Sequence, residues 1–279
     1  GDVYKRQVCQ DHPLTARVTV NRVWMRYFGR GIVETENDFG SRGAAPTHPE
    51  LLDYLASKFV TDDQWSTKKL VRRLCLSRTF RMASTVPVAA RESDPGNLRM
   101  THAFRRRPDA ECLRDSLLQI SGTLDLTVQG GRTIGKLGTY DNEYSHVTFP
   151  MNCRSVYVPV FRNTMLDLFE VFDVANPNLV TGMRTRSTRP AQALYMLNSP
   201  FVMRQARLAA DAFLKSPAFD VNHAETSIRH AWRLCTSREP AAEEVVALLP
   251  IVAEQPNSAE SWTTVFHALF ASVEFRYLE

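Results

Sequence analysis

Two helical patterns near the start of the chain constrain its fold more strongly than any other feature. Over residues 13–28, apolar residues recur at helical spacing and form one stripe: Leu14, Val18, Met25 and Phe28. Pro13 stands in the first turn of this pattern, and Gly29 stands where the helix should end. The same helix also carries arginine and asparagine at positions where a plain core helix would carry leucine or alanine.

A second helix is predicted to begin at residues 47–50. Thr47 and Glu50 form a T-x-x-E capping box, and Pro49 fits the first turn. The buried face of this helix follows at helical spacing: Leu51, Leu52, Leu55 and Phe59. Ser66 is expected to cap a third helix.

Helical periodicity covers most of the remaining chain. We expect helices over residues 109–121, 164–173, 190–198 and 200–214, with two or three more before the end. The last helices should bury two apolar sets: Ile228, Trp232 and Cys235, then Trp262, Phe266, Leu269 and Val273.

The section from residue 123 to residue 161 interrupts this pattern. Glycines cluster there, and the run SVYVPVF over residues 155–161 alternates like a short strand. The predicted fold class is therefore mainly α: a compact multi-helix domain with a small irregular or β insertion near residues 123–161.

With 279 residues the chain could form one large domain or two small ones, and it can bury a substantial core. Residues 1–11 are expected to be a non-native or disordered tail, since GDVYKRQ resembles a translated sequencing adapter. Residues 12–279 are expected to form a single helical domain. A loop rich in Pro, Ser and Gly at residues 84–97 is the first candidate for an internal boundary.

The basic residues are unusual in kind, with 28 arginines and six lysines in a chain of net charge +4. Arginine suits buried ion pairs and anion recognition, because its planar guanidinium holds two acceptors at once. Internal pairing with carboxylates and an anion-binding surface both remain open. Nucleic acid is not expected as a partner, because basic and acidic residues are interleaved along the sequence and no helix is expected to carry a dense basic stripe.

No membrane span, metal site or cofactor site is expected within this sequence. Apolar runs fall short of the roughly 20 residues needed to cross a bilayer. The five cysteines are widely spaced and form neither C-x-x-C nor the C-x-x-C-H of covalent haem attachment. A loop of oxygen and nitrogen donors is expected to be solvated rather than metal-binding: Asp141, Asn142, Glu143 and His146.

Polar residues around the first helix form one candidate ligand cluster: Arg17, Asn21, Arg22, Asn37, Asp38 and, as a general base or metal ligand, His48. Arg17 and Asn21 share a face of the helix, because they are four residues apart. These side chains could line a ligand cleft. The alternative is a buried network that fixes the helix against residues 36–38, because buried charges must be paired. For His48 the alternative is a structural role at the start of a helix.

Further candidates lie in the second half of the chain: Arg162, Asp173, Asn178 and Arg184. Arg184, with Arg186, could bind an anion such as a sulfated or carboxylated sugar. Asp173 falls on the side of its helix that is usually solvated. Glu111 and Asp115 have the spacing of paired carboxylates, but salt bridges to arginines are the simpler expectation. No catalytic residue can be assigned.

Motifs along the chain resemble those of the planctomycetal PSD domain, the domain of unknown function 1553. The first are HPLTARVTVNRVWMRYFGRG, ENDFG, THPELLDYLA and WSTKKLVRRL. RRRPDAECLRDSLLQISGTLD, VYVPVFRN, LFEVFDVANPN and PAQALYMLNSPFV follow in order. Each motif alone is weak, but their ordered occurrence from about His12 to the end is specific.

This resemblance implies a biological context but no particular chemical reaction. It implies the C-terminal domain of an extracytoplasmic protein, periplasmic or secreted, whose N-terminal part carries a cytochrome-c-like domain and a second domain of unknown function (1549). Haem c would belong to that part. The implied role is assistance to redox or processing chemistry in polysaccharide degradation, with anionic polysaccharide as a candidate partner. The alternative is a non-catalytic glycan-binding or protein-scaffolding domain.

Overall fold

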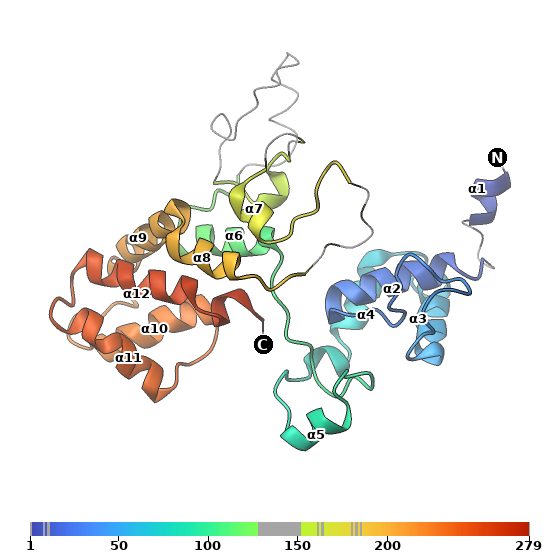
Figure 1. The fold of residues 1–279 in the computed structure, drawn as a ribbon, viewed down its shortest axis with the longest axis horizontal. Coiled ribbons are helices and arrows are strands. Elements are labelled where there is room, and N and C mark those ends of the chain that lie inside the picture. Colours follow the sequence, from blue (N-terminus) through green and yellow to red (C-terminus); the bar gives the residue numbers. More distant parts are fainter. Residues whose placement is uncertain are drawn as a thin grey trace, which may run out of the picture. The chain divides into compact units, whose positions relative to one another are not determined.

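The chain is mainly helical and divides into two compact units, Gly1–Arg106 and Arg107–Leu278, each with its own core (Figure 1). The computed structural model describes residues 2–7, 9, 12–127, 152–160, 162, 165–179, 181, 184 and 186–278. Within these ranges there is no sheet, and the one β contact is an isolated bridge between Asp125 and Cys153. None of the helices in these ranges is both long and apolar enough to cross a membrane.

The first unit is built on three helices that pack around one core. Its described elements are α1 (Asp2–Gln7), α2 (Thr15–Phe28), α3 (Pro49–Thr61), α4 (Thr67–Cys75), the 3-10 turn η1 (Thr79–Arg81) and α5 (Val88–Ser93). The core lies among α2, α3, α4 and the loop after α2, and its buried members include Val20, Trp24, Ile32, Leu55, Phe59 and Leu70. Two predicted helix ends are confirmed. Gly29 closes α2 in the left-handed conformation at φ 84°, and Ser66 accepts a hydrogen bond from the Lys69 amide at the start of α4.

The capping box predicted at Thr47 is wrong. The N-cap of α3 is His48, and its side chain makes no capping hydrogen bond. Thr47 is bonded to the loop after α2, where its backbone N and its Oγ1 donate to the Ile32 carbonyl at 2.9 and 3.2 Å. The Thr47 hydroxyl, which the local pattern assigned to capping α3, therefore makes a tertiary contact instead.

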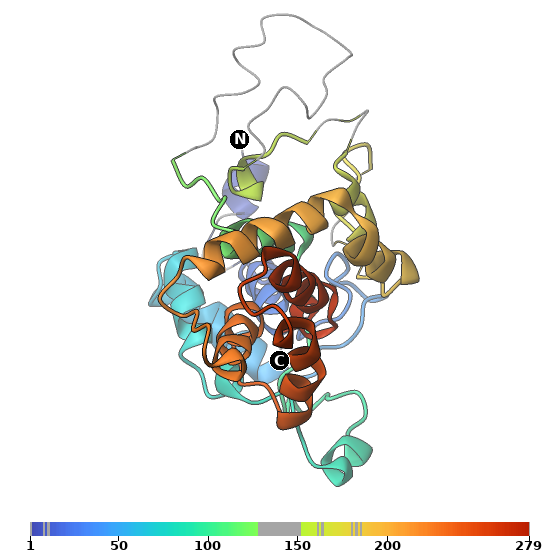
Figure 2. The same cartoon turned by 90° about the vertical axis from the view of Figure 1, so that its left-hand side faces the viewer.

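The second unit is a larger helical bundle. Its described elements are α6 (Ala110–Ile120), the 3-10 turn η3 (Ser155–Tyr157), α7 (Asp167–Val171), α8 (Pro190–Asn198), α9 (Pro200–Leu214), α10 (Ala224–Thr236), α11 (Ala242–Ala253), α12 (Ala259–Ala271) and the 3-10 turn η4 (Glu274–Arg276). α12 packs along α9, and α10 and α11 lie against α12 (Figures 1 and 2). The core between them includes Leu117, Phe169, Met196, Val202, Ile228, Trp262 and Phe266. The bounds predicted for α8 and α9 are confirmed.

The strand predicted at residues 155–161 is wrong where the structure describes it, because Ser155–Tyr157 forms a 3-10 turn. This segment does not pair with a neighbouring strand in the described residues. It forms hydrogen bonds with polar side chains of α6 instead. The N and Oγ of Ser155 donate to Asp115 Oδ1 at 2.7 and 2.6 Å, and Arg114 Nη1 donates to Ser155 Oγ at 3.1 Å. Residues 128–151 and 161 of the predicted insertion lie outside the described residues.

Two other boundaries differ from the prediction. The helix expected over residues 164–173 is the shorter α7, Asp167–Val171, and Asp173 beyond it adopts φ 63°. Val273 was expected to be buried on the last helix, but α12 ends at Ala271 and Val273 is 51% exposed. In both places the helical spacing of apolar residues in the sequence continues beyond the last residue of the observed helix.

Candidate functional site

The candidate site lies in the first unit, between α2 and the loop that joins α2 to α3. Asn21 on α2 is fully buried, and its side-chain amide forms two hydrogen bonds with the backbone of this loop. Its Nδ2 donates to the Val33 carbonyl and its Oδ1 accepts from the Val33 amide, both at 2.9 Å. Asn21 therefore satisfies both backbone groups of a buried loop residue, which would otherwise be costly to bury.

The same loop then makes a tight turn around Asp38. Thr35 Oγ1 donates to the Asp38 carbonyl at 2.7 Å and accepts from the Ala44 amide at 2.8 Å. Asp38 Oδ1 accepts from the Gly40 amide at 2.9 Å. At Gly43 the backbone lies so close to the Asp38 carbonyl oxygen that any side chain would collide with it. These contacts fix the positions of residues 36–40.

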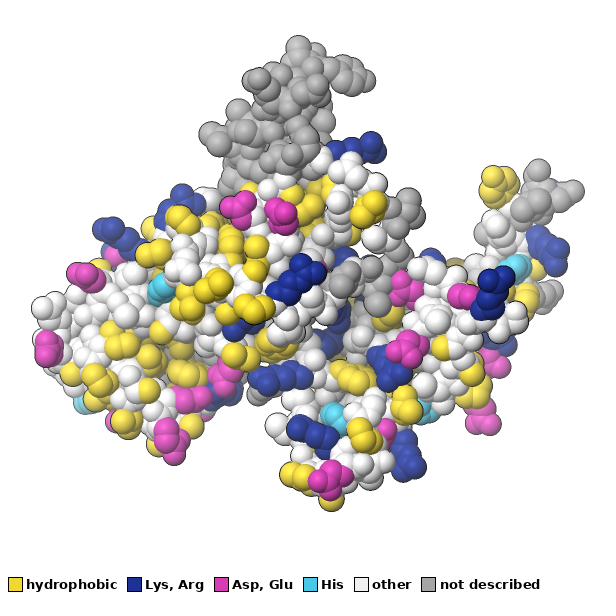
Figure 3. Space-filling model, viewed as in Figure 1, with side chains coloured by type: hydrophobic (Ala, Val, Ile, Leu, Met, Phe, Trp, Pro, Cys, Tyr) yellow, Lys and Arg dark blue, Asp and Glu magenta, His cyan; other side chains and the backbone are white. Residues whose placement is uncertain are grey.

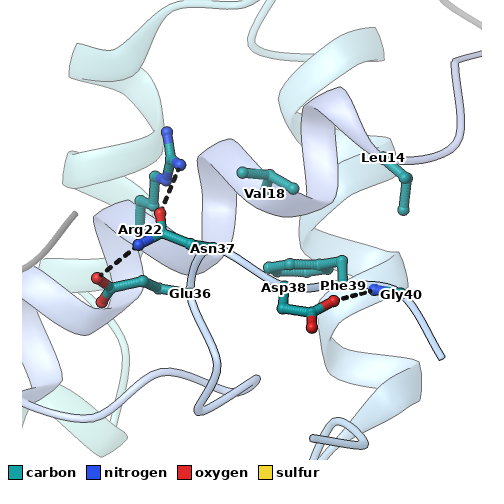
Figure 4. Close-up of a pocket in the computed structure, with 8 residues that line it drawn as sticks. All are labelled: Leu14, Val18, Arg22, Glu36, Asn37, Asp38, Phe39 and Gly40. Carbon is teal, nitrogen blue, oxygen red and sulfur yellow. Dashed lines mark hydrogen bonds between the residues drawn. The ribbon is translucent and has the colours of Figure 1, made fainter. Parts of the chain in front are cut away.

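A groove with a volume of about 330 Å³ lies between α2 and this turn (Figure 4). It is lined by Leu14, Val18, Arg22, Glu36, Asn37, Asp38, Phe39 and Gly40. Val18 and Arg22 lie on one face of α2, and Leu14, the N-cap of this helix, continues the same spacing of four residues. The volume is at the lower end of the roughly 300–1,000 Å³ range of small-molecule sites.

One end of the groove is polar, and the other presents two apolar side chains beside one carboxylate. At the polar end, Arg22 Nη2 donates to Asn37 Oδ1 at 3.1 Å, and Asn37 Nδ2 donates to Glu36 Oε1 at 3.3 Å (Figure 4). Glu36 is only 8% exposed, and its Oε2 has no hydrogen-bond partner within the described part of the chain. Leu14 and Phe39 lie at the other end, together with the Asp38 carboxylate and Gly40 (Figure 4), and Phe39 packs against the core of the unit.

Two other predicted residues of this unit are engaged elsewhere. Arg17 reaches α3, where its Nε donates to Asp53 Oδ1 at 2.6 Å, and it also binds the Pro13 carbonyl. The hydrogen bond from Arg17 lowers the pKa of Asp53. His48 Nδ1 lies 3.0 Å from Thr47 Oγ1 at the start of α3. Of the six residues predicted around the first helix, the groove therefore contains Arg22, Asn37 and Asp38.

In the second unit, Asp173 belongs to a buried ion pair instead of the solvated face that was expected. Arg107 Nη2 donates to Asp173 Oδ2 at 2.7 Å, and the two side chains are 7% and 8% exposed. The N and Oγ of Ser187 also donate to the Asp173 carboxylate, at 2.8–2.9 Å. Burial raises the pKa of Asp173, but the hydrogen bonds from Ser187 and Arg107 outweigh it, and the net shift is downward.

Arg184 is also committed to a carboxylate. Its Nη1 and Nη2 each donate to an oxygen of Glu111 at 2.7 Å, and this pairing raises the pKa of Arg184. The salt bridge expected for Glu111 is therefore present, with an arginine far along the chain. Asn178 Nδ2 donates to the Arg162 carbonyl at 3.0 Å. The four predicted residues of this unit thus make three separate contacts, and none of these contacts joins them into one site.

The sequence did not identify four residues as members of a site: Glu36, Phe39, Val18 of α2 and Leu14 at its N-cap. The ENDFG run contained both loop residues, but nothing in the sequence showed that they face the α2 stripe. Among the residues that the structure describes, no group of three His, Cys, Asp or Glu side chains could hold a metal ion. The loop with Asp141 and His146 lies outside the described residues.

The family comparison agrees with the motifs. A family model described as "Protein of unknown function (DUF1553)" matches residues 5–252, which is most of the chain. No curated protein and no solved structure matches it. The chain therefore belongs to the DUF1553 family of proteins of unknown function.

Proposed function

We propose that the groove between α2 and residues 36–40 binds a sugar ring and that this chain is a glycan-binding domain. The observation that carries the proposal is that polar side chains and the apolar side chains Leu14, Val18 and Phe39 line one groove together. A sugar ring offers hydroxyls at its edge and C–H groups on its faces. Arg22 donates, Asn37 both donates and accepts, and the carboxylates of Glu36 and Asp38 accept, so together they match hydroxyls.

The charges of the groove favour a neutral sugar unit over an anionic one. Its lining holds one arginine and two carboxylates, Glu36 and Asp38. Glu36 is almost buried and forms no ion pair with any residue that the structure describes, and charges act strongly where water is excluded. An anion that fills the groove would meet a lining with a net charge of −1. The groove therefore suits an uncharged ring, whereas the earlier expectation placed an anionic sugar at Arg184.

The context that we propose for this binding is polysaccharide degradation outside the cytoplasm. The domain would hold a glycan for redox or processing chemistry carried out by other parts of the same polypeptide, which include cytochrome-c-like and 1549 domains in a planctomycete or related bacterium. Motif resemblance supports this context. No C-x-x-C-H occurs in the sequence, so its residues do not fit covalent haem attachment.

The test is direct binding of neutral oligosaccharides to the full chain, first on a glycan panel and then by calorimetry. Replacing Arg22 and Asn37 together by alanine should weaken the affinity for a bound oligosaccharide roughly 10- to 100-fold, because two polar contacts worth about 1 kcal/mol or more each are lost. The fold should survive, because both side chains are exposed.

The matched control is Asn178→Ala, which removes an exposed asparagine that also donates to a partner in its own unit. This variant should bind the oligosaccharide as the parent chain does. Equal loss in both variants, or no binding of any neutral oligosaccharide at millimolar concentration, would contradict a glycan-binding groove.

A further inference from the structure

The positive charge of the first unit is concentrated in one stretch of sequence. Residues 1–106 contain 18 basic and 11 acidic side chains, a net charge of +7. Residues 64–91 alone contribute +7, because they hold seven basic residues and no acid: Lys68, Lys69, Arg72, Arg73, Arg78, Arg81 and Arg91. The rest of the unit is therefore balanced in charge.

This stretch contains α4, a short helix with one apolar and one basic face. Leu70 and Leu74 are buried in the core, whereas Lys68, Lys69 and Arg72 are exposed. The expectation that no helix carries a dense basic stripe is wrong for α4. Dark-blue side chains are visible over the part of the first unit between α4 and α5 (Figure 3).

Most of these charges lack a counter-charge within the residues that the structure describes. Arg73 pairs with Asp63 at 2.8 Å. In the described ranges no ion pair involves Lys68, Arg72, Arg78 or Arg81, and Lys69 Nζ only approaches the Asp62 carbonyl at 3.5 Å. Uncompensated like charges on one face raise the local concentration of anions. The surface of α4 and η1 is thus positively charged and suits an anionic partner.

We propose that this basic surface binds the acidic groups of a sulfated or carboxylated polysaccharide. A helix of nine residues is about 14 Å long, so its charges can contact several groups of one polymer. Single-stranded nucleic acid is disfavoured because α4 carries no aromatic side chain for base stacking. A membrane surface is disfavoured because the apolar face of α4 is already buried in the core.

The choice of a glycan as the polymer rests on the proposed function, because the groove for a neutral ring lies in the same unit. The positive charge of the α4 surface does not depend on whether the groove binds a sugar. The two sites would divide the recognition of a partly charged polysaccharide between them: the groove takes an uncharged ring, and the α4 surface takes acidic substituents.

The test compares dextran sulfate with dextran, two polymers with the same backbone. The full chain should bind dextran sulfate, and its affinity should fall roughly 20- to 50-fold between 50 and 200 mM NaCl if three to four acidic groups are neutralised and each contact releases about 0.7 counter-ion, as on a single-stranded polyanion. Dextran should show no such salt dependence. The combined variant Lys68→Glu, Lys69→Glu and Arg72→Gln should weaken binding to dextran sulfate at least about tenfold.

This variant should keep its fold, because the new acids lie in the first turn of α4 and Glu at position 69 completes a capping box with Ser66. The matched control on α9 and its C-cap removes the same charge from exposed positions: Arg204→Glu, Arg207→Glu and Lys215→Gln. The control should bind dextran sulfate within about threefold of the parent chain, a change that general charge effects allow.

Equal loss in both variants would overturn the assignment to α4. Tighter binding to duplex DNA or to vesicles containing anionic lipid, lost in the α4 variant alone, would overturn the choice of a glycan. The groove variant Arg22→Ala with Asn37→Ala separates the two proposals. It should retain salt-dependent binding to dextran sulfate, even if no neutral oligosaccharide binds the chain.

Discussion

Replacing Asn21 by alanine is expected to lower the free energy of unfolding of the first unit by about 2–5 kcal/mol. The substitution leaves both the amide and the carbonyl of Val33 buried without a partner, and each unsatisfied group costs about 1–3 kcal/mol. Urea unfolding of the parent and variant chains measures the change. Hydrogen exchange should localise it, because the Val33 amide should lose its protection.

The control for Asn21 is Thr19→Ala on the same helix. Thr19 is half-buried, and its hydroxyl donates to the Thr15 carbonyl within α2, so its loss should cost less than about 1 kcal/mol. If Asn21→Ala is no more destabilising than Thr19→Ala, the amide does not hold the loop. The groove would then lack the support described for it.

Replacing Asp173 by alanine should lower the free energy of unfolding of the second unit by about 3 kcal/mol. The change leaves Arg107 buried without its carboxylate and also removes the acceptor of the Ser187 amide and hydroxyl. Differential scanning calorimetry of the two chains tests this result. Asp173→Asn should be milder, because asparagine keeps two hydrogen-bonding atoms and tolerates the φ of 63°.

The same ion pair predicts a pH dependence. The pKa of Asp173 is lowered in the folded state, so its contribution to stability is present above the unfolded value of about 4 and is lost as pH falls through the folded value. The stability gap between the parent chain and Asp173→Asn should therefore be constant near neutral pH and shrink below about pH 4. A gap that widens on acidification would contradict the sign of this pKa shift.

Helix positions were predictable wherever local signals agreed with the tertiary structure. α8 and α9 begin at Pro190 and Pro200 and end where the sequence indicated, because proline fixes the first turn and apolar spacing marks the buried face. The helix end at Gly29 follows from the same kind of local rule. These elements needed no knowledge of distant residues.

The errors arose where a distant residue decided the outcome. Ser155 joins a 3-10 turn because Asp115 on α6 takes its amide and hydroxyl, and Thr47 leaves the helix start to bind Ile32. Glu111 pairs with Arg184 across the second unit, a partner that spacing along one helix cannot reveal. A short sequence pattern contains no information about such partners.

The candidate site was only partly predictable for the same reason. Arg22, Asn37 and Asp38 were identified as polar residues that could line a cleft or form a buried network. In the structure Asn21 takes the structural role, and the other three line a groove. Glu36 and the apolar side chains needed coordinates, because they come together only once the loop folds back against α2.

The most direct test of a sugar-binding groove is an NMR titration of the 15N-labelled full chain with neutral oligosaccharides from the glycan panel. We predict saturable changes in amide chemical shift centred on residues 36–40 and on the α2 face at Leu14, Val18 and Arg22. Saturable changes confined to the second unit, or no saturable change with any oligosaccharide, would contradict it.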